Sequence, residues 1–126
     1  MDFRRFATWS NIFYLVPLAA AAYYEIWWVA VAVLALFIFS LAFHLSLERR
    51  FVAADIFAGL VVAICGGILL YLSDFESFYT TVTLGLVAAG LAIRYGFERG
   101  NRGGIYHGLW HLVAAAAILT CVLSYI

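Results

Sequence analysis

The residues most able to do chemistry are three histidines, each within or beside an apolar stretch of the chain. His107 and His111 are four residues apart, a spacing that places both side chains on one face of a helix, one turn apart. Both imidazoles of such a pair can point at one metal ion. The remaining histidine is His44, at the edge of another apolar stretch. We therefore predict that His44, His107 and His111 bind one Zn²⁺ ion.

Two further polar residues are expected near this ion. Ser40 and His44 are also four residues apart, and Asp55 is the acidic residue embedded in an apolar stretch. A lone carboxylate is costly in a bilayer and persists there when it is paired or faces water. Beside zinc, Asp55 would accept and return the proton of a water molecule, and Ser40 would donate to a developing oxyanion. Asp55 and Ser40 are therefore the predicted catalytic residues.

Each of these residues also has an ordinary structural explanation when it is taken alone. A histidine pair at helical spacing is a weak indication of metal, and a helical serine usually bonds its own backbone. Asp55 could pair with Arg49 or Arg50 near the membrane surface. Two isolated cysteines, Cys65 and Cys121, lack any metal or redox spacing and are expected to be small core residues.

The composition predicts an all-α membrane protein. Two thirds of the 126 residues are apolar (67%), more than a soluble domain of this size needs. The apolar stretches predict one polytopic transmembrane bundle of about five helices, at residues 8–24, 26–47, 52–72, 77–95 and 105–125. Short connections predict that consecutive helices are antiparallel neighbours. No basic face would remain in water, which argues against nucleic acid as a partner.

Three local patterns add detail to these helices. Pro17 predicts a kink in the first helix. Ser73 and Glu76 have the spacing of a capping box before the fourth helix. Three glycines of the third helix are expected to allow close contact with a neighbour: Gly59, Gly66 and Gly67.

The cations predict the orientation, because five spans place all of them on one side of the membrane. They are all arginines: Arg4, Arg5, Arg49, Arg50, Arg94, Arg99 and Arg102. The positive-inside rule then puts the N-terminus in the cytoplasm and the C-terminus outside. The five candidate site residues would share a depth about 5–10 Å below the cytoplasmic surface. They can meet only if the helices at 26–47, 52–72 and 105–125 are neighbours. The compact chain with short loops predicts an integral multi-pass protein of the bacterial cytoplasmic (inner) membrane.

These residues resemble a known family of enzymes. The segment Ser40 to Asp55 resembles the Ser-x3-His-x10-Asp segment of the alkaline ceramidases, and His107-Gly-Leu-Trp-His111 resembles the His-x3-His of their last helix. The run from Ser10-Asn11 to Pro17 is similar to the Ser-Asn-x5-Pro pattern of their first helix. Alkaline ceramidases belong to the CREST superfamily of membrane hydrolases. The resemblance implies zinc on the three histidines, water activated by Asp55 and an oxyanion assisted by Ser40.

The reaction implied by the resemblance is hydrolysis of a lipid amide, as in conversion of ceramide to a sphingoid base and a fatty acid. Another acyl lipid, including an ester, is an open alternative substrate. The family has seven helices, so a shorter bundle would need lipid or a second copy of the chain to complete its cavity. The family's acidic calcium site has no counterpart, since Asp2 alone precedes the first helix and Arg4 and Arg5 dominate there.

Two other functions compete with hydrolysis. The chain could be a non-catalytic receptor or scaffold of the same superfamily, in which zinc stabilises the bundle. It could also be a haem-binding or ion-conducting bundle. Histidines four residues apart on one helix cannot bind one haem iron from opposite faces, and no polar stripe continues to the outer side of the membrane.

Overall fold

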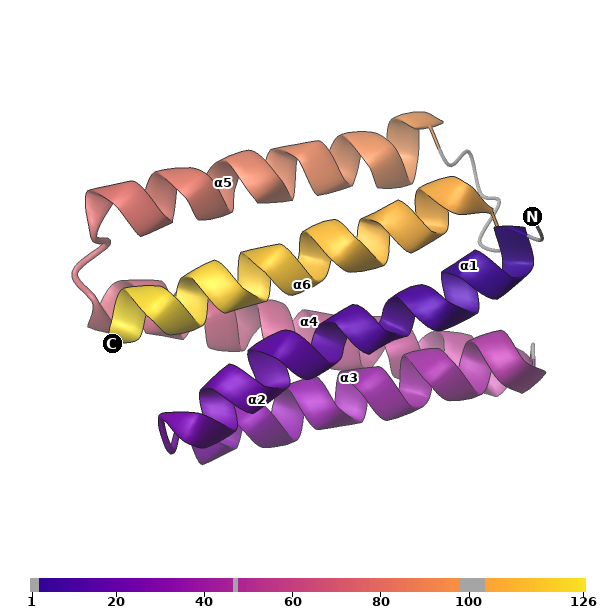
Figure 1. The fold of residues 1–126 in the computed structure, drawn as a ribbon, viewed down its shortest axis with the longest axis horizontal. Coiled ribbons are helices and arrows are strands. Elements are labelled where there is room, and N and C mark those ends of the chain that lie inside the picture. Colours follow the sequence, from indigo (N-terminus) through magenta and orange to yellow (C-terminus); the bar gives the residue numbers. More distant parts are fainter. Residues whose placement is uncertain (1–2, 47, 98–103) are drawn as a thin grey trace.

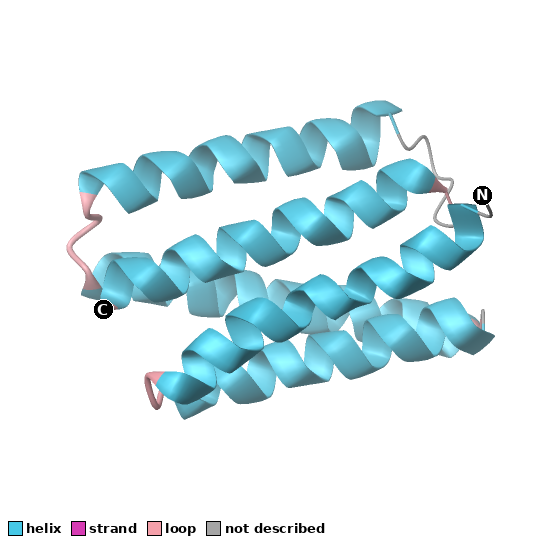
Figure 2. Ribbon diagram, viewed as in Figure 1, coloured by secondary structure: helices cyan, strands magenta, loops and turns pink. Residues whose placement is uncertain are grey.

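The computed structural model describes residues 3–46, 48–97 and 104–126, and these residues form helices without any strand (Figures 1 and 2). The first helical segment consists of three parts, and four longer helices follow it. The parts of the first segment are α1 (Phe3–Trp9), the 3₁₀ turn η1 (Ser10–Tyr14) and α2 (Leu15–Tyr23). The longer helices are α3 (Trp27–Ser46), α4 (Arg49–Leu72), α5 (Ser77–Leu91) with its π-helical extension η2 (Ala92–Phe97), and α6 (Ile105–Tyr125).

Four of these helices are long and apolar enough to cross a membrane: α3, α4, α5 with η2, and α6. The prediction of an all-α bundle of apolar helices is confirmed at this level. The first segment is not one continuous α-helix, because the 3₁₀ turn η1 interrupts it just before Pro17. Proline lacks the N–H that the carbonyl four residues earlier would accept, which explains irregular helix geometry at this point.

Four helical segments form a ring, and α5 lies outside it. The first segment packs against α3 on one side and α6 on the other, and α4 also packs against both α3 and α6. In this order α3 and α6 face each other across the ring, and so do the first segment and α4. Figure 1 shows α5 at the edge of the bundle, beside α6. The interior of the ring is therefore where side chains from four segments can meet.

The expectation that consecutive helices are neighbours is confirmed for the first segment with α3, for α3 with α4 and for α5 with α6, and it is wrong for α4 with α5. Although a short turn joins it to α4, α5 packs against α6 instead. A methyl group added at Gly90 of α5 would lie 2.8 Å from the ring of Trp110, so this glycine makes room for the indole. The hydroxyls of Thr83 and Thr120 are 2.6 Å apart and link the same two helices. The fit between the surfaces of α5 and α6 therefore determines the position of α5, although its short connection leads from α4.

Two of the turns between helices have the hydrogen bonds of a Schellman motif. At the end of α2, the N–H of Ile26 bonds the carbonyl of Ala21 at 2.8 Å, and the N–H of Glu25 bonds that of Ala22 at 3.1 Å. At the end of α4, the N–H of Phe75 bonds the carbonyl of Leu70 in the same way, at 2.8 Å. This motif needs a left-handed residue, usually glycine. Here Glu25 (φ 60°) takes that conformation after α2.

The turn before α5 also corrects the predicted capping box. The Ser73 hydroxyl donates to the carbonyl of Leu70 at 2.8 Å, so Ser73 belongs to the end of α4. Glu76 is itself the N-cap of α5, and its carboxylate accepts the N–H of Tyr79 at 2.8 Å. A side chain that accepts from the third residue of a helix is the ordinary N-cap arrangement. The sequence pattern therefore indicates the start of α5 correctly, but Glu76 is the capping residue and Ser73 takes no part in the cap.

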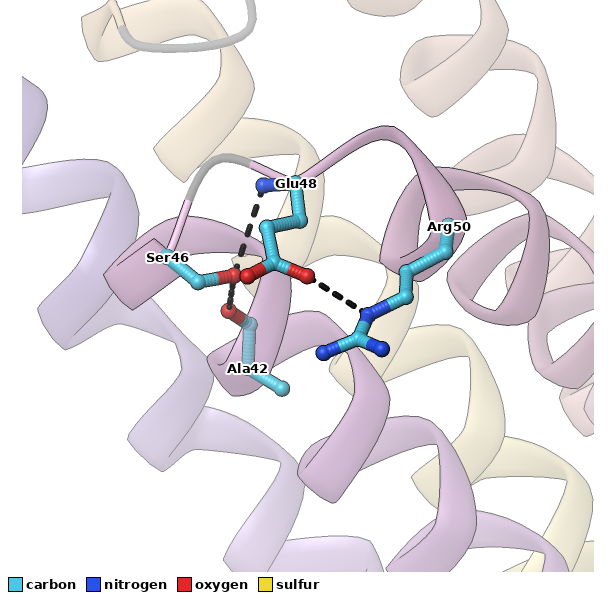
Figure 3. Close-up of polar contacts among 4 residues, drawn as sticks. All are labelled: Ala42, Ser46, Glu48 and Arg50. Carbon is cyan, nitrogen blue, oxygen red and sulfur yellow. Dashed lines mark hydrogen bonds and ion pairs between the residues drawn. The ribbon is translucent and has the colours of Figure 1, made fainter.

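The connection between α3 and α4 is closed by side chains at the arginine-rich end of the bundle (Figure 3). The Ser46 hydroxyl donates to the carbonyl of Ala42 at 2.7 Å and accepts the N–H of Glu48 at 3.3 Å. The carboxylate of Glu48 forms an ion pair with Arg50. These bonds hold the start of α4 close to the end of α3, next to His44.

Close helix contacts in the ring depend on glycines of two helices. A methyl group added at Gly66 of α4 would lie 3.2 Å from Cys121 of α6, so the predicted close contact is confirmed there. The same prediction is wrong for Gly59 and Gly67, where an added methyl group would meet nothing within 4 Å. Gly108 of α6 lies against the ring of Phe6. Both cysteines are free thiols and buried, as expected of small core residues.

Candidate metal centre

The three histidines come together inside the ring of helices. His44 lies near the end of α3, and His107 and His111 lie in the first two turns of α6. Their ring centroids are 4.9 Å apart for His44 and His107, 5.1 Å for His44 and His111, and 4.6 Å for the pair on α6. One nitrogen of each ring lies within 4.8 Å of those of the other two. Two of the rings are buried, at 3% and 2% exposure.

This donor set fits a zinc ion. Zn²⁺ binds imidazole nitrogens at about 2.0–2.1 Å in tetrahedral sites, so nitrogens that share one ion lie roughly 3.3 Å apart. The observed spacing of up to 4.8 Å is close enough for small side-chain rotations to close it.

The helices position these rings through their packing. The spacing of four residues puts both histidines of α6 on the face that points into the ring of helices. Phe6 of the first segment lies directly on Gly108, so the backbone between the two histidines is held against that segment. His44 reaches the same point from α3, across the ring. The predicted neighbourhood of the helices at 26–47, 52–72 and 105–125 is confirmed for α4, which packs against both α3 and α6. The helices α3 and α6 lie across the ring from each other and approach through the histidine side chains.

The structure adds two residues whose contacts with the cluster were not predicted. The Ser10 hydroxyl lies 2.8 Å from Nδ1 of His111, and the ring of Tyr14 packs beside the same imidazole at 5.7 Å. Both side chains are buried at 2% exposure. Ser10 belongs to the Ser-Asn-x5-Pro pattern of the first helix, and that pattern alone assigns it no role. The available signal was its spacing of four residues from Tyr14, which puts both on one helix face.

The two predicted catalytic residues lie on the helices that flank the cluster. Ser40 is buried on α3, and its hydroxyl is 3.5 Å from Nε2 of His111, at the outer limit of a hydrogen bond. Asp55 is half-buried on α4, which packs against both helices that carry the histidines.

Positive charge gathers at the same end of the bundle. Arg49 and Arg50 are exposed at the start of α4, and Arg94 is half-buried in η2. Arg99 and Arg102 lie outside the described residues, as do Asp2 and the side chains of Arg4 and Arg5. The cluster is thus at the end of the bundle where α3 ends and α4 begins with Arg49 and Arg50.

An apolar groove of about 370 Å³ lies between the first segment and α3. Its lining residues are Thr8, Trp9, Asn11, Ile12, Leu15, Phe37, Leu41 and Leu45. The three histidines do not line this groove, although Ser10, which contacts His111, lies between two of its lining residues.

Comparison of the chain with protein-family models, with curated proteins and with solved structures found no match. The resemblance to alkaline ceramidases thus rests on the residues quoted above.

Proposed function

We propose that this chain belongs to the class of helical membrane proteins built around a zinc centre. Within that class, we propose that it is a hydrolase that cleaves the amide or ester bond of an acyl lipid, with ceramide as the leading candidate. The observation that carries the proposal is the convergence of His44, His107 and His111, with one nitrogen of each within 4.8 Å of the others. The ceramidase-like spacing of Ser40, His44 and Asp55 supports the choice of reaction.

The proposed roles follow from the chemistry of each group. When bound by the three histidines, zinc supplies Lewis-acid activation of a carbonyl and of water. Asp55 holds and returns a proton, as a carboxylate within reach of a reacting water does. Ser40 stabilises negative charge by donating its hydroxyl hydrogen. The burial of Ser40 at 1% exposure favours this role, because a hydrogen bond in a dry site is stronger than one in water.

The proposed setting is the cytoplasmic membrane of a bacterium. The first segment would supply a fifth span, with the N-terminus in the cytoplasm and the C-terminus outside. In this orientation the arginine-bearing ends of the helices face the cytoplasm, and the histidines lie just below the lipid headgroups. That depth suits an amide or ester bond, which joins a lipid's headgroup region to its acyl chain.

The apolar groove supports an acyl lipid as the substrate. Its lining residues follow one another at helical spacing on two segments, so the groove runs lengthwise, as an extended hydrocarbon chain would. Because the bundle is small, lipid or a second copy of the chain would complete the wall around the substrate. A homo-oligomer is compatible with the proposal and is not required by it.

Hydrolysis by the purified protein tests the proposal. The full chain in lipid nanodiscs is incubated with ceramides and with phospholipids, with and without a zinc chelator, and fatty-acid release is measured by mass spectrometry. Metal content is measured on the same sample. Chelator-sensitive release with one zinc per chain is the expected result. Bound zinc without release from any acyl lipid would favour the non-catalytic receptor or scaffold, and absence of zinc would reject the metal centre itself.

A further inference from the structure

Ser10 makes a long-range polar contact with the histidine cluster. Its hydroxyl oxygen is 2.8 Å from Nδ1 of His111, a residue 101 positions further along the chain. The same oxygen is 2.9 Å from the carbonyl oxygen of Ala7, one turn earlier in the first segment. Ser10 and Ala7 are buried at 2% and 0% exposure, so water does not compete for either contact.

These two contacts determine where the hydrogens lie. A carbonyl oxygen can only accept, so the single hydroxyl hydrogen of Ser10 must be the one donated to Ala7. The oxygen of Ser10 then has only lone pairs left for His111, and Nδ1 must be the donor. If the Ser10 hydroxyl donated to Nδ1 instead, the oxygens of Ser10 and Ala7 would lie 2.9 Å apart with no hydrogen between them. His111 is thus assigned the tautomer with its hydrogen on Nδ1 and a lone pair on Nε2.

The nitrogen with the lone pair is the one that faces the other residues of the site. Nε2 of His111 is 3.5 Å from the hydroxyl of Ser40, which lies one turn from His44 on α3. The opposite edge of the ring is occupied by Ser10. Metal-bound histidines generally donate their other N–H to an oxygen, which fixes the tautomer and the ring orientation.

We propose that Ser10 is a positioning residue for the metal centre: it accepts the Nδ1 hydrogen of His111 and thereby presents Nε2 as the metal ligand. The proposal rests on metal binding in the proposed function and does not depend on hydrolysis. It also assigns a task to the first segment, which carries none of the three histidines. Ser10 begins the 3₁₀ turn η1, and Tyr14 at its end packs on the same imidazole.

A simpler explanation is that Ser10 only bonds its own helix. Many helical serines donate to a carbonyl of the preceding turn. Ser124 does so in α6, where its hydroxyl donates to the carbonyl of Cys121 at 2.6 Å. Ser124 is in the last turn of α6 and the histidines are in the first two, so it is a matched control: the same backbone bond without the histidine.

The test compares metal binding by the full chain and by three variants in detergent micelles. Zn²⁺ affinity is measured by competition with a chelator, and the ligand field is measured from the visible spectrum of bound Co²⁺. Ser10→Ala is expected to lower the affinity roughly 10–100-fold and to change the Co²⁺ spectrum. Ser10→Thr, which keeps a hydroxyl, should restore most of the affinity, and Ser124→Ala should leave it unchanged. Wild-type affinity and spectrum in Ser10→Ala would overturn the proposal.

A second measurement does not depend on the folding of any variant. Long-range ¹H–¹⁵N NMR of the metal-free wild-type protein distinguishes the two neutral tautomers of His111. A hydrogen on Nδ1 is expected, and a hydrogen on Nε2 would contradict the assigned role. If the protein binds zinc in a Ser10-dependent way but hydrolyses no acyl lipid, the hydrolase proposal is rejected and the positioning role of Ser10 is kept. Absence of metal binding in the wild type would overturn both.

Discussion

At the scale of single residues, the site separates groups that would hold the metal from groups that would act on the substrate. The histidines occupy two helices that face each other across the ring, whereas Asp55 lies on a third helix, α4. A carboxylate with no ligand role can be changed without removing the ion. Substitutions of Asp55 and Ser40 therefore test catalysis apart from metal binding.

Asp55→Asn should abolish most turnover while zinc stays bound. The amide has nearly the same shape as the carboxylate but cannot take up a proton, and loss of a general base costs about 10²–10⁴ in rate. Fatty-acid release and zinc content are measured on one preparation. Asp74→Asn is the control, because this exposed carboxylate lies in the turn between α4 and α5. Loss of zinc together with activity would reassign Asp55 to the metal or to the fold.

Ser40→Ala should lower turnover with little change in zinc affinity. Removing one donor to a developing oxyanion typically costs about 10²–10³ in rate. Ser124→Ala is a suitable control, because the hydroxyl of Ser124 bonds a backbone carbonyl in the last turn of α6, whereas the histidines of α6 lie in its first two turns. The rate constant under saturating substrate is the quantity to compare. An effect of Ser40→Ala on substrate affinity alone would contradict the oxyanion role.

At the scale of helices and turns, close contacts at glycine determine how α6 fits into the ring. A methyl group added at Gly108 would overlap the ring of Phe6, so Gly108→Ala forces Phe6 and the first segment away from α6. We expect a loss of about 1–3 kcal/mol, the usual cost of overpacking. Gly85→Ala is the control, because Gly85 has open space around it and alanine favours helix. The free energy of unfolding in a denaturing detergent is measured for both variants. Equal losses for Gly108→Ala and Gly85→Ala would contradict the close contact with Phe6.

A substitution in the turn between α2 and α3 is expected to increase stability. Glu25 has φ 60°, a conformation that glycine adopts without the steric cost of a side chain. Glu25→Gly should therefore stabilise the protein by about 1 kcal/mol, measured by the same unfolding experiment. Asp74, which has φ 54°, should gain less from the same change because aspartate tolerates this region better. A destabilised Glu25→Gly variant would mean that the glutamate side chain has another role.

The sequence predicted the helices and the approach of the histidines because both follow from local periodicity. Apolar runs locate the long helices, and a spacing of four residues puts His107 and His111 on one face. The contacts of α5 could not be predicted in this way. They depend on the fit of Trp110 against Gly90, two residues whose types say nothing about which helix they will meet. The contact of Ser10 with His111 joins residues 101 positions apart, so no local pattern reveals it.

At the scale of the whole molecule, the histidine cluster joins helices that the rest of the packing holds only indirectly. The first segment and α4 each bridge α3 and α6, and the three imidazoles meet between them. A metal ion bound there would link the N-terminal and C-terminal parts of the bundle. Metal binding should therefore be coupled to the stability of the whole fold and not only to local order around the site.

Removal of the metal should lower the unfolding temperature of the entire bundle. A ligand that binds only the folded state stabilises it by about 2.7 kcal/mol when its concentration is 100 times Kd. Thermal unfolding is followed by circular dichroism with zinc, with chelator, and with chelator followed by excess zinc. Replacing all three histidines by alanine should remove the response to zinc, which separates site binding from unspecific effects of the chelator. An unfolding temperature that zinc does not change in the wild type would contradict a metal link between α3 and α6.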